Sequence, residues 1–276
     1  MDSGELASNL HKALFGREAQ IYLTGDFGTF KMGRLASFVS GFNKTGLFGP
    51  KVSPFSASWL NVPGHKNVMT GDFTSLDNVL VYSTPTLAGC QGHLQYSFGM
   101  NQDAIVDGKW KEGSQEVDRT AAAALTYTNE RLHGVVIVDT VAWGDEQTGE
   151  DLQDLRRVSV GGNVDFGAFK AFAAGQWFDG ACSVAMAEID GTAKLLQTSK
   201  NLAAKDGLDG FGVNVGVTIP VKSFLVKLST GYMNAERTTR IRTARAATRP
   251  KASKPRISAN KRRCRANAVA TSSASK

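Results

Sequence analysis

The chain has 276 residues, 42% hydrophobic and 21% charged, with 29 glycines, 3 cysteines and 4 histidines. Three cysteines without a CxxC pair exclude a disulfide framework. No apolar run reaches the roughly 18 residues of a spanning helix, which excludes an α-helical membrane protein. The opening residues MDSGELASNLHK contain neither a basic segment nor an apolar one, so we expect no signal peptide in the chain as written.

The net charge of +7 hides two different regions. Residues 237–276 carry nine Arg and four Lys but no Asp or Glu, whereas residues 1–236 hold the other 19 basic residues and all 25 acidic ones. We therefore predict a body, 1–236, followed by a basic, low-complexity tail, 237–276, that is disordered.

Alternation of apolar and polar residues with a period of two dominates the body and predicts strands. In the clearest case Phe211, Val213 and Val215 fall on one face, and the intervening Gly212 and Asn214 on the other. About ten strands of roughly 9–12 residues are expected. In chain order they lie within residues 14–25, 27–35, 76–85, 91–99, 119–131, 133–144, 156–167, 167–178, 208–220 and 223–234.

The connections alternate between short turns and long polar loops. Short turns are predicted near residues 25–27, 87–90, 130–133, 165–167 and 220–222. The long loops between them are residues 37–75, 100–116, 144–154 and 179–207. Hairpins with all short turns at one end and all long loops at the other predict an up-and-down antiparallel sheet.

Such a sheet has two ways to cover its apolar face. In water it would pack against a second layer, whereas in an outer membrane it would close into a barrel, apolar outward and polar inward. Strands of about 9–11 residues suit a tilted crossing of a bilayer, while soluble strands cluster near five or six. Aromatic residues at many strand ends match interfacial girdles, so we favour a transmembrane β-barrel.

The polar faces of the strands then line a water-filled lumen. They carry isolated charges among Gly, Ser, Thr and Gln, as a wet interior requires. The candidates from this pattern are Glu18, Gln20, Lys31, Gln95, Arg157, Lys170 and Lys227.

Residues 14–99 carry a family resemblance. Gly16, Arg17, Gly25, Phe27, Gly28, Thr29, Gly33 and Arg34 form one hairpin pattern; Leu76, Asp77, Asn78, Tyr82, Ser83 and Pro85, with Tyr96, Ser97, Phe98 and Gly99, form a second. Both hairpins resemble those of the general porins of β-proteobacterial outer membranes. Residues 117–234 fit the same family mainly through the rhythm of strands and loops.

The resemblance implies a 16-stranded barrel, usually a homotrimer embedded in outer-membrane lipid, that passes small hydrophilic solutes by diffusion. It implies an inward-folded constriction loop, here 37–75, with acidic residues facing basic residues of the wall. Asp72 is the loop candidate; Lys31 and Arg34 are the wall candidates. Parity places Lys31 on the lumen face, but places Arg34 with Phe30 and Met32 unless a bulge intervenes.

The chain departs from that family at both ends. Members start with a signal peptide and about three further strands, and end in a strand with a terminal aromatic residue. We therefore expect an incomplete barrel, truncated at its N-terminus, which as written should not form a closed, functional channel. Back-translation of the Arg-, Thr- and Ala-rich tail in another frame yields porin-like segments, which suggests a frameshift after about residue 236.

Other functions find little support. The basic tail could be a nucleic-acid or membrane-surface arm, but it has no aromatic residue to stack on bases, so no specific nucleic acid is expected. The four histidines lack metal-ligand spacing and no catalytic motif stands out, so we predict no enzyme, metal or cofactor. The alternative function is a soluble or surface-exposed β-sheet binding protein with long recognition loops.

Overall fold

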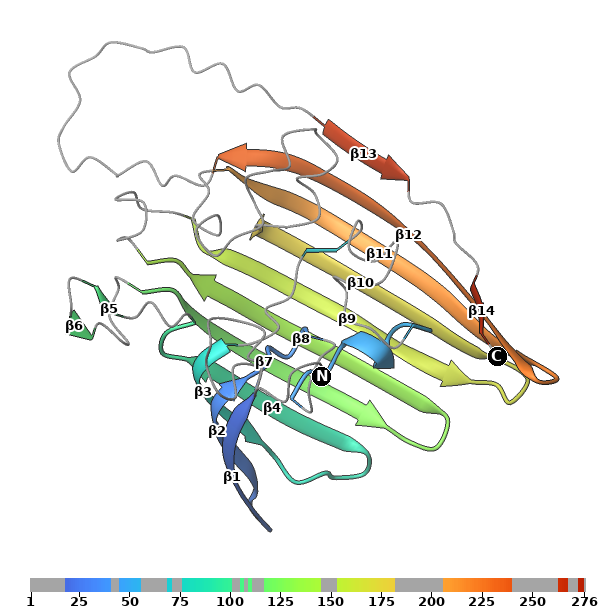
Figure 1. The fold of residues 1–276 in the computed structure, drawn as a ribbon, viewed down its shortest axis with the longest axis horizontal. Helices are drawn as coiled ribbons and strands as arrows, with labels where there is room; N and C mark the ends of the chain where they lie inside the picture. Colours follow the sequence, from blue (N-terminus) through green and yellow to red (C-terminus); the bar gives the residue numbers. More distant parts are fainter. Residues whose placement is uncertain are drawn as a thin grey trace, which may run out of the picture.

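The computed structural model describes residues 18–40, 45–55, 69–70, 76–100, 105–106, 109–110, 117–144, 153–181, 206–239, 263–267 and 273–275. These residues build one long, curved antiparallel sheet whose strands follow one another in chain order (Figure 1). No helix in the described part of the chain has the length and apolarity needed to cross a membrane. Among the described residues one 3₁₀ turn, η1 (Gly49–Lys51), lies between the second and third strands.

Ten successive strands of 7 to 16 residues make up the body of this sheet, each matching a predicted strand. They are β1 (Ala19–Gly25), β2 (Gly28–Leu35), β3 (Leu76–Ser83), β4 (Cys90–Ser97), β7 (Arg119–Thr128), β8 (Leu132–Ala142), β9 (Leu155–Asp165), β10 (Lys170–Ala181), β11 (Asp206–Val221) and β12 (Phe224–Thr239). Short and long connections alternate as predicted, so the all-β, up-and-down architecture is confirmed.

Four shorter strands complete the described structure. β5 (Ile105–Val106) pairs with β6 (Lys109–Trp110) in a separate two-stranded sheet. From the basic tail, β13 (Arg263–Asn267) and β14 (Ser273–Ser275) both pair with β12. The exposed edge of β12 explains this pairing, since unpaired backbone groups accept any extended segment. Within the described residues β1 and the tail strands do not pair, so the sheet is open.

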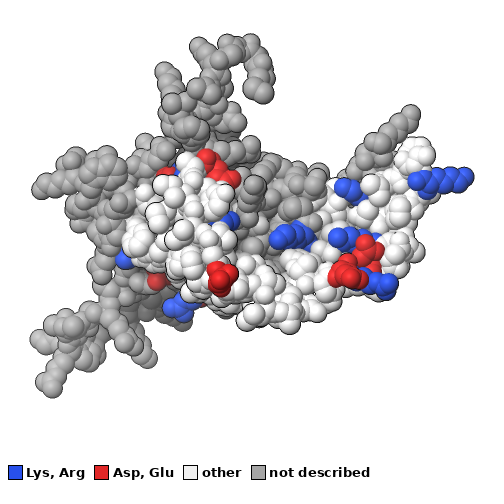
Figure 2. Space-filling model, turned by 90° about the horizontal axis from the view of Figure 1, so that it is seen from below, with Lys and Arg blue, Asp and Glu red and all other residues white. Residues whose placement is uncertain are grey.

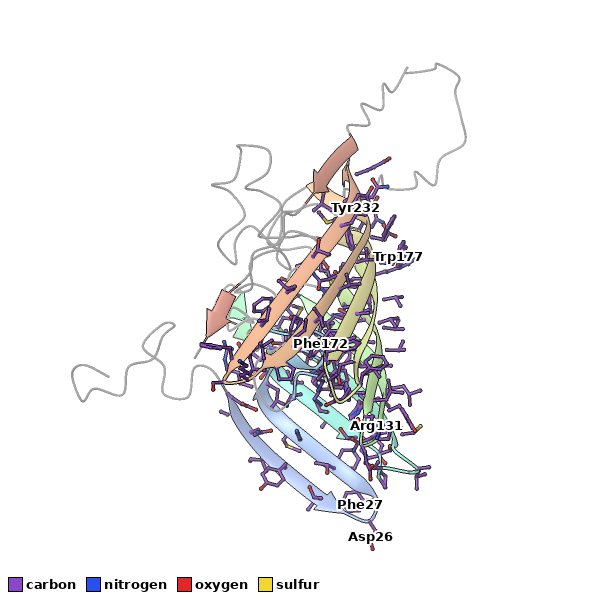
Figure 3. The ribbon with its side chains drawn as sticks, turned by 90° about the vertical axis from the view of Figure 1, so that its right-hand side faces the viewer. Asp26, Phe27, Arg131, Phe172, Trp177 and Tyr232 are labelled. Carbon is purple, nitrogen blue, oxygen red and sulfur yellow. The ribbon has the colours of Figure 1, made fainter. Side chains whose placement is uncertain are left out.

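The two faces of the sheet differ in what covers them, which confirms the alternation read from the sequence. On β9, the alternate residues Arg157 and Ser159 are buried, whereas Val160, which points to the opposite face, is 48% exposed. Figure 3 shows the same contrast on β10, where Trp177 and Phe172 project from opposite sides. We call the face bearing Arg157 the inner face and the face bearing Val160 the outer face.

The connection between β2 and β3 supplies the cover of the inner face. Phe38, Phe48 and Val52 of this connection are buried in one cluster with Val79 and Ile137 of the sheet. The inner face is therefore partly apolar in this part of the wall. The physical reason is that a folded-in segment needs an apolar surface to pack on, and the wall provides it.

Two glycines on the inner face make this close packing possible. A Cβ at Gly161 would lie 2.8 Å from Val52, and one at Gly216 would lie 2.6 Å from Pro54. A larger residue at either position would force its neighbour, Val52 or Pro54, to shift.

Candidate pore-lining face

Six neighbouring strands align their inner-face side chains on one level, and four of these side chains are polar or charged. The register pairs Lys31 with Val81, Val81 with Gln95, and Gln95 with Ala122. Continuing along the same level, Ala122 pairs with Asp139 and Asp139 with Arg157. The predicted residues Lys31, Gln95 and Arg157 thus share one row across the wall, since pairing partners in a sheet point to the same face.

At the centre of this row a buried ion pair joins β8 and β9. Arg157 donates from Nε to the two carboxylate oxygens of Asp139 at 3.0 and 3.2 Å, and from Nη2 at 2.6 Å. Arg157 is 1% exposed and Asp139 is 6% exposed. A bidentate guanidinium–carboxylate pair in such a dry place holds two strands in a fixed geometry.

The ion pair extends into a hydrogen-bonded network that reaches the covering segment. Arg157 Nη1 donates to Thr70 Oγ1 at 3.3 Å, and the Thr70 amide and hydroxyl donate to Gln176 Oε1 at 2.7 and 2.6 Å. Gln176 Nε2 in turn donates to Ser159 Oγ at 3.2 Å. We call Asp139, Arg157, Thr70, Gln176 and Ser159 the Thr70 network; it ties the segment to three strands.

Two further contacts anchor the same segment at other strands. The Phe38 amide donates to Gln95 Oε1 at 3.2 Å, while Gln95 Nε2 donates to the Ala36 carbonyl at 2.9 Å. Farther along, Asn163 Nδ2 donates to the Lys51 carbonyl at 2.6 Å. The segment therefore lies against β4, β8, β9 and β10 instead of extending away from the sheet.

Basic side chains gather on the inner face below this segment. Lys170 pairs in register with Thr218, and Thr218 pairs with Lys227. The Lys51 charge interacts electrostatically with both His93 and His133. Lys31 also acts on His93, and Lys170 also acts on His133. Seen from below, several Lys and Arg side chains lie beside one another on the described surface, with Asp and Glu side chains next to some of them (Figure 2).

The Lys51 ammonium is partly desolvated in this position. Solvent reaches the side chain, but the surrounding wall and segment remove enough water to lower the pKa of Lys51 from its ordinary 10.5. In the described part of the chain, no carboxylate forms an ion pair with Lys51, Lys170 or Lys227.

The remaining predicted residues lie near the open edge. Glu18 is half-buried and accepts a hydrogen bond of 3.0 Å from Gln20. Arg34 forms an ion pair with Asp77 of β3, and the register between β2 and β3 shifts at this point. The bulge that parity required is thus present: Gly33, with a φ of +134°, makes it. Asp72 lies outside the described residues.

Sequence reasoning missed Asp139, Gln176 and Thr70. On the inner face of β8, Asp139 alternates with the buried apolar residues Ile137 and Val141. The sequence of β8 therefore shows no polar face on which Asp139 could be predicted. Gln176 and Thr70 become recognisable only when the segment and the wall are in contact. No group of three or more His, Cys, Asp or Glu capable of holding a metal occurs among the described residues.

A single-layered up-and-down wall, apolar outside and carrying charges inside beneath an inward-folded connection, is the architecture of a membrane-spanning β-barrel. The model of the Gram-negative porin family matches residues 2–256, and the chain belongs to that family. This places it in the outer membrane, in a family of channels and not of enzymes.

Two relatives extend the comparison. An outer membrane porin protein of Bordetella pertussis is 28% identical over 247 residues, which cover 83% of this chain and 58% of that protein. The anion-selective porin from Comamonas acidovorans has the same fold, with a TM-score of 0.51 and 18% identity over 81% of this chain and 61% of that one. The chain thus spans about three-fifths of the length of each.

Proposed function

We propose that this protein forms the wall of a passive diffusion channel for small hydrophilic solutes across the outer membrane, with a preference for anions. The observation that carries the proposal is the inner face itself: Lys31, Gln95, Asp139 and Arg157 share one level of the wall, beneath a segment folded against it. Segment 37–75 acts as the constriction, and Glu18, Gln20, Lys31, Arg34, Asp72, Gln95, Arg157, Lys170 and Lys227 line the pore.

The balance of charge on the inner face supports the anion preference. The carboxylates of Asp139 and Asp77 are each neutralised by an arginine, whereas Lys51, Lys170 and Lys227 have no such partner in the described part of the chain. Uncompensated cations along a narrow aqueous path attract anions and repel cations. The name of the Comamonas acidovorans porin, anion-selective, agrees with this inference.

We propose a homotrimer by analogy with the family, surrounded by outer-membrane lipid. The row of exposed apolar residues on the outer face supports the contact with lipid. No described feature favours the alternative of a soluble binding protein.

Reversal potentials in planar lipid bilayers test the proposal. The chain is reconstituted under a KCl gradient, and the double variant Lys170→Glu/Lys227→Glu is compared with Arg131→Glu, which alters a turn residue outside the inner face. We expect the double variant to move the reversal potential toward cation preference and the turn variant to leave it unchanged. Equal shifts from both, or no conductance from the unmodified chain, would overturn the proposal.

A further inference from the structure

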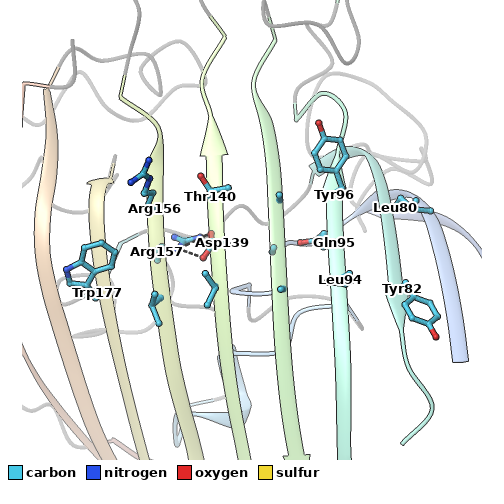
Figure 4. A pocket seen from close by; sticks show the side chains of 15 residues that line it. Leu80, Tyr82, Leu94, Gln95, Tyr96, Asp139, Thr140, Arg156, Arg157 and Trp177 are labelled. Atoms are coloured by element: carbon cyan, nitrogen blue, oxygen red, sulfur yellow. Dashed lines mark hydrogen bonds and ion pairs between the residues drawn. The ribbon is translucent and has the colours of Figure 1, made fainter. Parts of the chain in front are cut away.

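A second polar region lies on the inner face, nearer the short turns than the Arg157 ion pair. Figure 4 shows that ion pair as dashed lines between β8 and β9. Asn163 follows Arg157 by six residues on β9, which is about 20 Å along the strand toward the β9–β10 turn. The register partners of Asn163 are His133 on β8 and Phe172 on β10. This region is therefore separate from the row that includes Arg157.

His133 brings a buried nitrogen without a partner to this region. The residue is 8% exposed, and its Nδ1 lies 2.8 Å from the Thr128 hydroxyl. Its Nε2 has no hydrogen-bond partner within the described part of the chain. When the Thr128 hydroxyl donates to Nδ1, the ring proton is on Nε2, which is then a free donor. A buried donor without a partner is costly, and a bound acceptor would remove that cost.

Two lysines place their charges close to His133. Asn163 Nδ2 donates to the Lys51 carbonyl at 2.6 Å, which fixes the Lys51 backbone against β9. Lys170 Nζ lies 5.6 Å from the centre of the Phe172 ring, so this ammonium reaches along β10 toward the level of Asn163. The Lys51 and Lys170 charges both act on the His133 ring. The covering segment and two strands thus bring two cations and one buried donor together.

The described wall supplies no acid that neutralises these two lysines. Asp165 is the register partner of Lys170, but it is exposed and its Oδ1 accepts a hydrogen bond of 2.8 Å from the Gly167 amide. Within the described residues no hydrogen bond or ion pair joins the Asp165 carboxylate to Lys170 or Lys51. The charges of the region are therefore available to an anion from solution.

We propose that Lys51, Lys170 and His133 bind a phosphate group at the short-turn end of the inner face. Three donors from different elements match separate oxygens of a tetrahedral oxyanion, and the double charge of phosphate gains more from two ammonium groups than chloride does. The short turns of porin-type barrels are periplasmic, so the site lies at the periplasmic end of the pore. The proposal rests on the channel proposal for the route by which solutes reach this face.

Phosphorus NMR of the full chain, refolded in a phosphorus-free detergent, tests the site. Inorganic phosphate is titrated in chloride buffer, and we expect saturable binding. Lys170→Gln should weaken it about tenfold, as the loss of one charge-assisted contact would, and Lys170→Arg should recover most of it. Lys222→Gln, at the exposed β11–β12 turn, should bind as the unmodified chain does. Glucose 6-phosphate in place of phosphate tells whether the bound group is a free ion or an ester, and either must depend on Lys170.

A second variant tests the buried donor without touching the charges. His133→Phe keeps an aromatic ring but removes Nε2, and should weaken phosphate binding several-fold. Saturable binding that neither Lys170→Gln nor His133→Phe changes would place the site elsewhere and overturn the proposal. Equal losses in Lys170→Gln and Lys222→Gln, or no saturation, would overturn it in favour of a diffuse basic surface. Because binding is measured without conductance, a chain that conducts anions but does not bind phosphate contradicts this site alone. A chain that binds phosphate but does not conduct contradicts the channel proposal alone.

Discussion

Two consecutive arginines on β9 show how the burial and bonding of the same side chain differ between the two faces of the wall. Arg157, on the inner face, is 1% exposed and bonded to Asp139 and Thr70. Arg156, on the outer face, is exposed at the edge of an apolar groove. One step along a strand moves a side chain into another environment, because successive residues point to opposite faces. The same charge therefore organises the interior at one position and meets lipid at the next.

The contrast also explains why the inner face is partly apolar. A wall that holds a folded-in segment needs both hydrocarbon contacts and hydrogen bonds on that face. Phe38 and Val52 pack on the wall, while Gln95 and Asn163 bond the backbone of the same segment. The outer face needs only apolar side chains, since lipid offers no hydrogen bonds.

The largest expected effect comes from breaking the inner pair. Asp139→Ala leaves the Arg157 guanidinium buried without its counter-charge, which should lower the free energy of unfolding by about 3–5 kcal/mol. Urea unfolding of the refolded chain, followed by tryptophan fluorescence, measures the loss. The control is the double variant Asp139→Leu/Arg157→Met, which removes both charges and should recover most of the stability. A loss below about 0.5 kcal/mol in the single variant would contradict a buried pair.

The next effect tests the outer face at the middle of the same strand. Val160→Arg places a charge where hydrocarbon is expected, and should destabilise the chain in lipid vesicles by about 2–4 kcal/mol. Thr218→Arg, on the half-buried part of the inner face, should cost much less because water can reach the new charge. Unfolding in vesicles compares the two. A reversed order would mean that the faces are assigned the wrong way round.

The alternation of apolar and polar residues predicted which face a side chain points to wherever the strand is regular. Lys31, Gln95 and Arg157 could be placed on one face from alternation alone, and the register then aligned them in one row. Ten strands and their alternating connections also followed from the sequence, because turns and strand lengths are encoded locally.

The parts that escaped prediction depend on contacts between distant residues. Asp139 lies among apolar residues whose partner, the covering segment, has no periodic pattern of its own. Arg34 could not be assigned to a face because the bulge at Gly33 is set by the pairing of β2 with β3. Thr70 and Gln176 are 106 positions apart, and nothing local in either residue indicates their contact.

A smaller effect tests the attachment of the covering segment to the wall. Thr70→Val removes the hydroxyl that bonds Gln176 and Arg157, and should lower the free energy of unfolding by about 1 kcal/mol. Thr45→Val is a matched control on the same segment, because the buried Thr45 hydroxyl has no hydrogen-bond partner among the described residues. Urea unfolding should show a loss for Thr70→Val and none for Thr45→Val. Equal losses would show that the Thr70 network does not anchor the segment.

The smallest effect is a pH dependence of the inner face. Desolvation lowers the pKa of Lys51 below 10.5, so its charge is lost on raising the pH before that of an exposed lysine. The anion preference should therefore weaken as the pH rises through this lowered pKa, and recover on return to neutral pH. In Lys51→Gln this pH-dependent loss of anion preference should disappear, because glutamine has no ammonium proton to release. Reversal potentials between pH 7 and pH 10 measure both chains, and an unchanged step in the variant would assign the titration to another inner lysine.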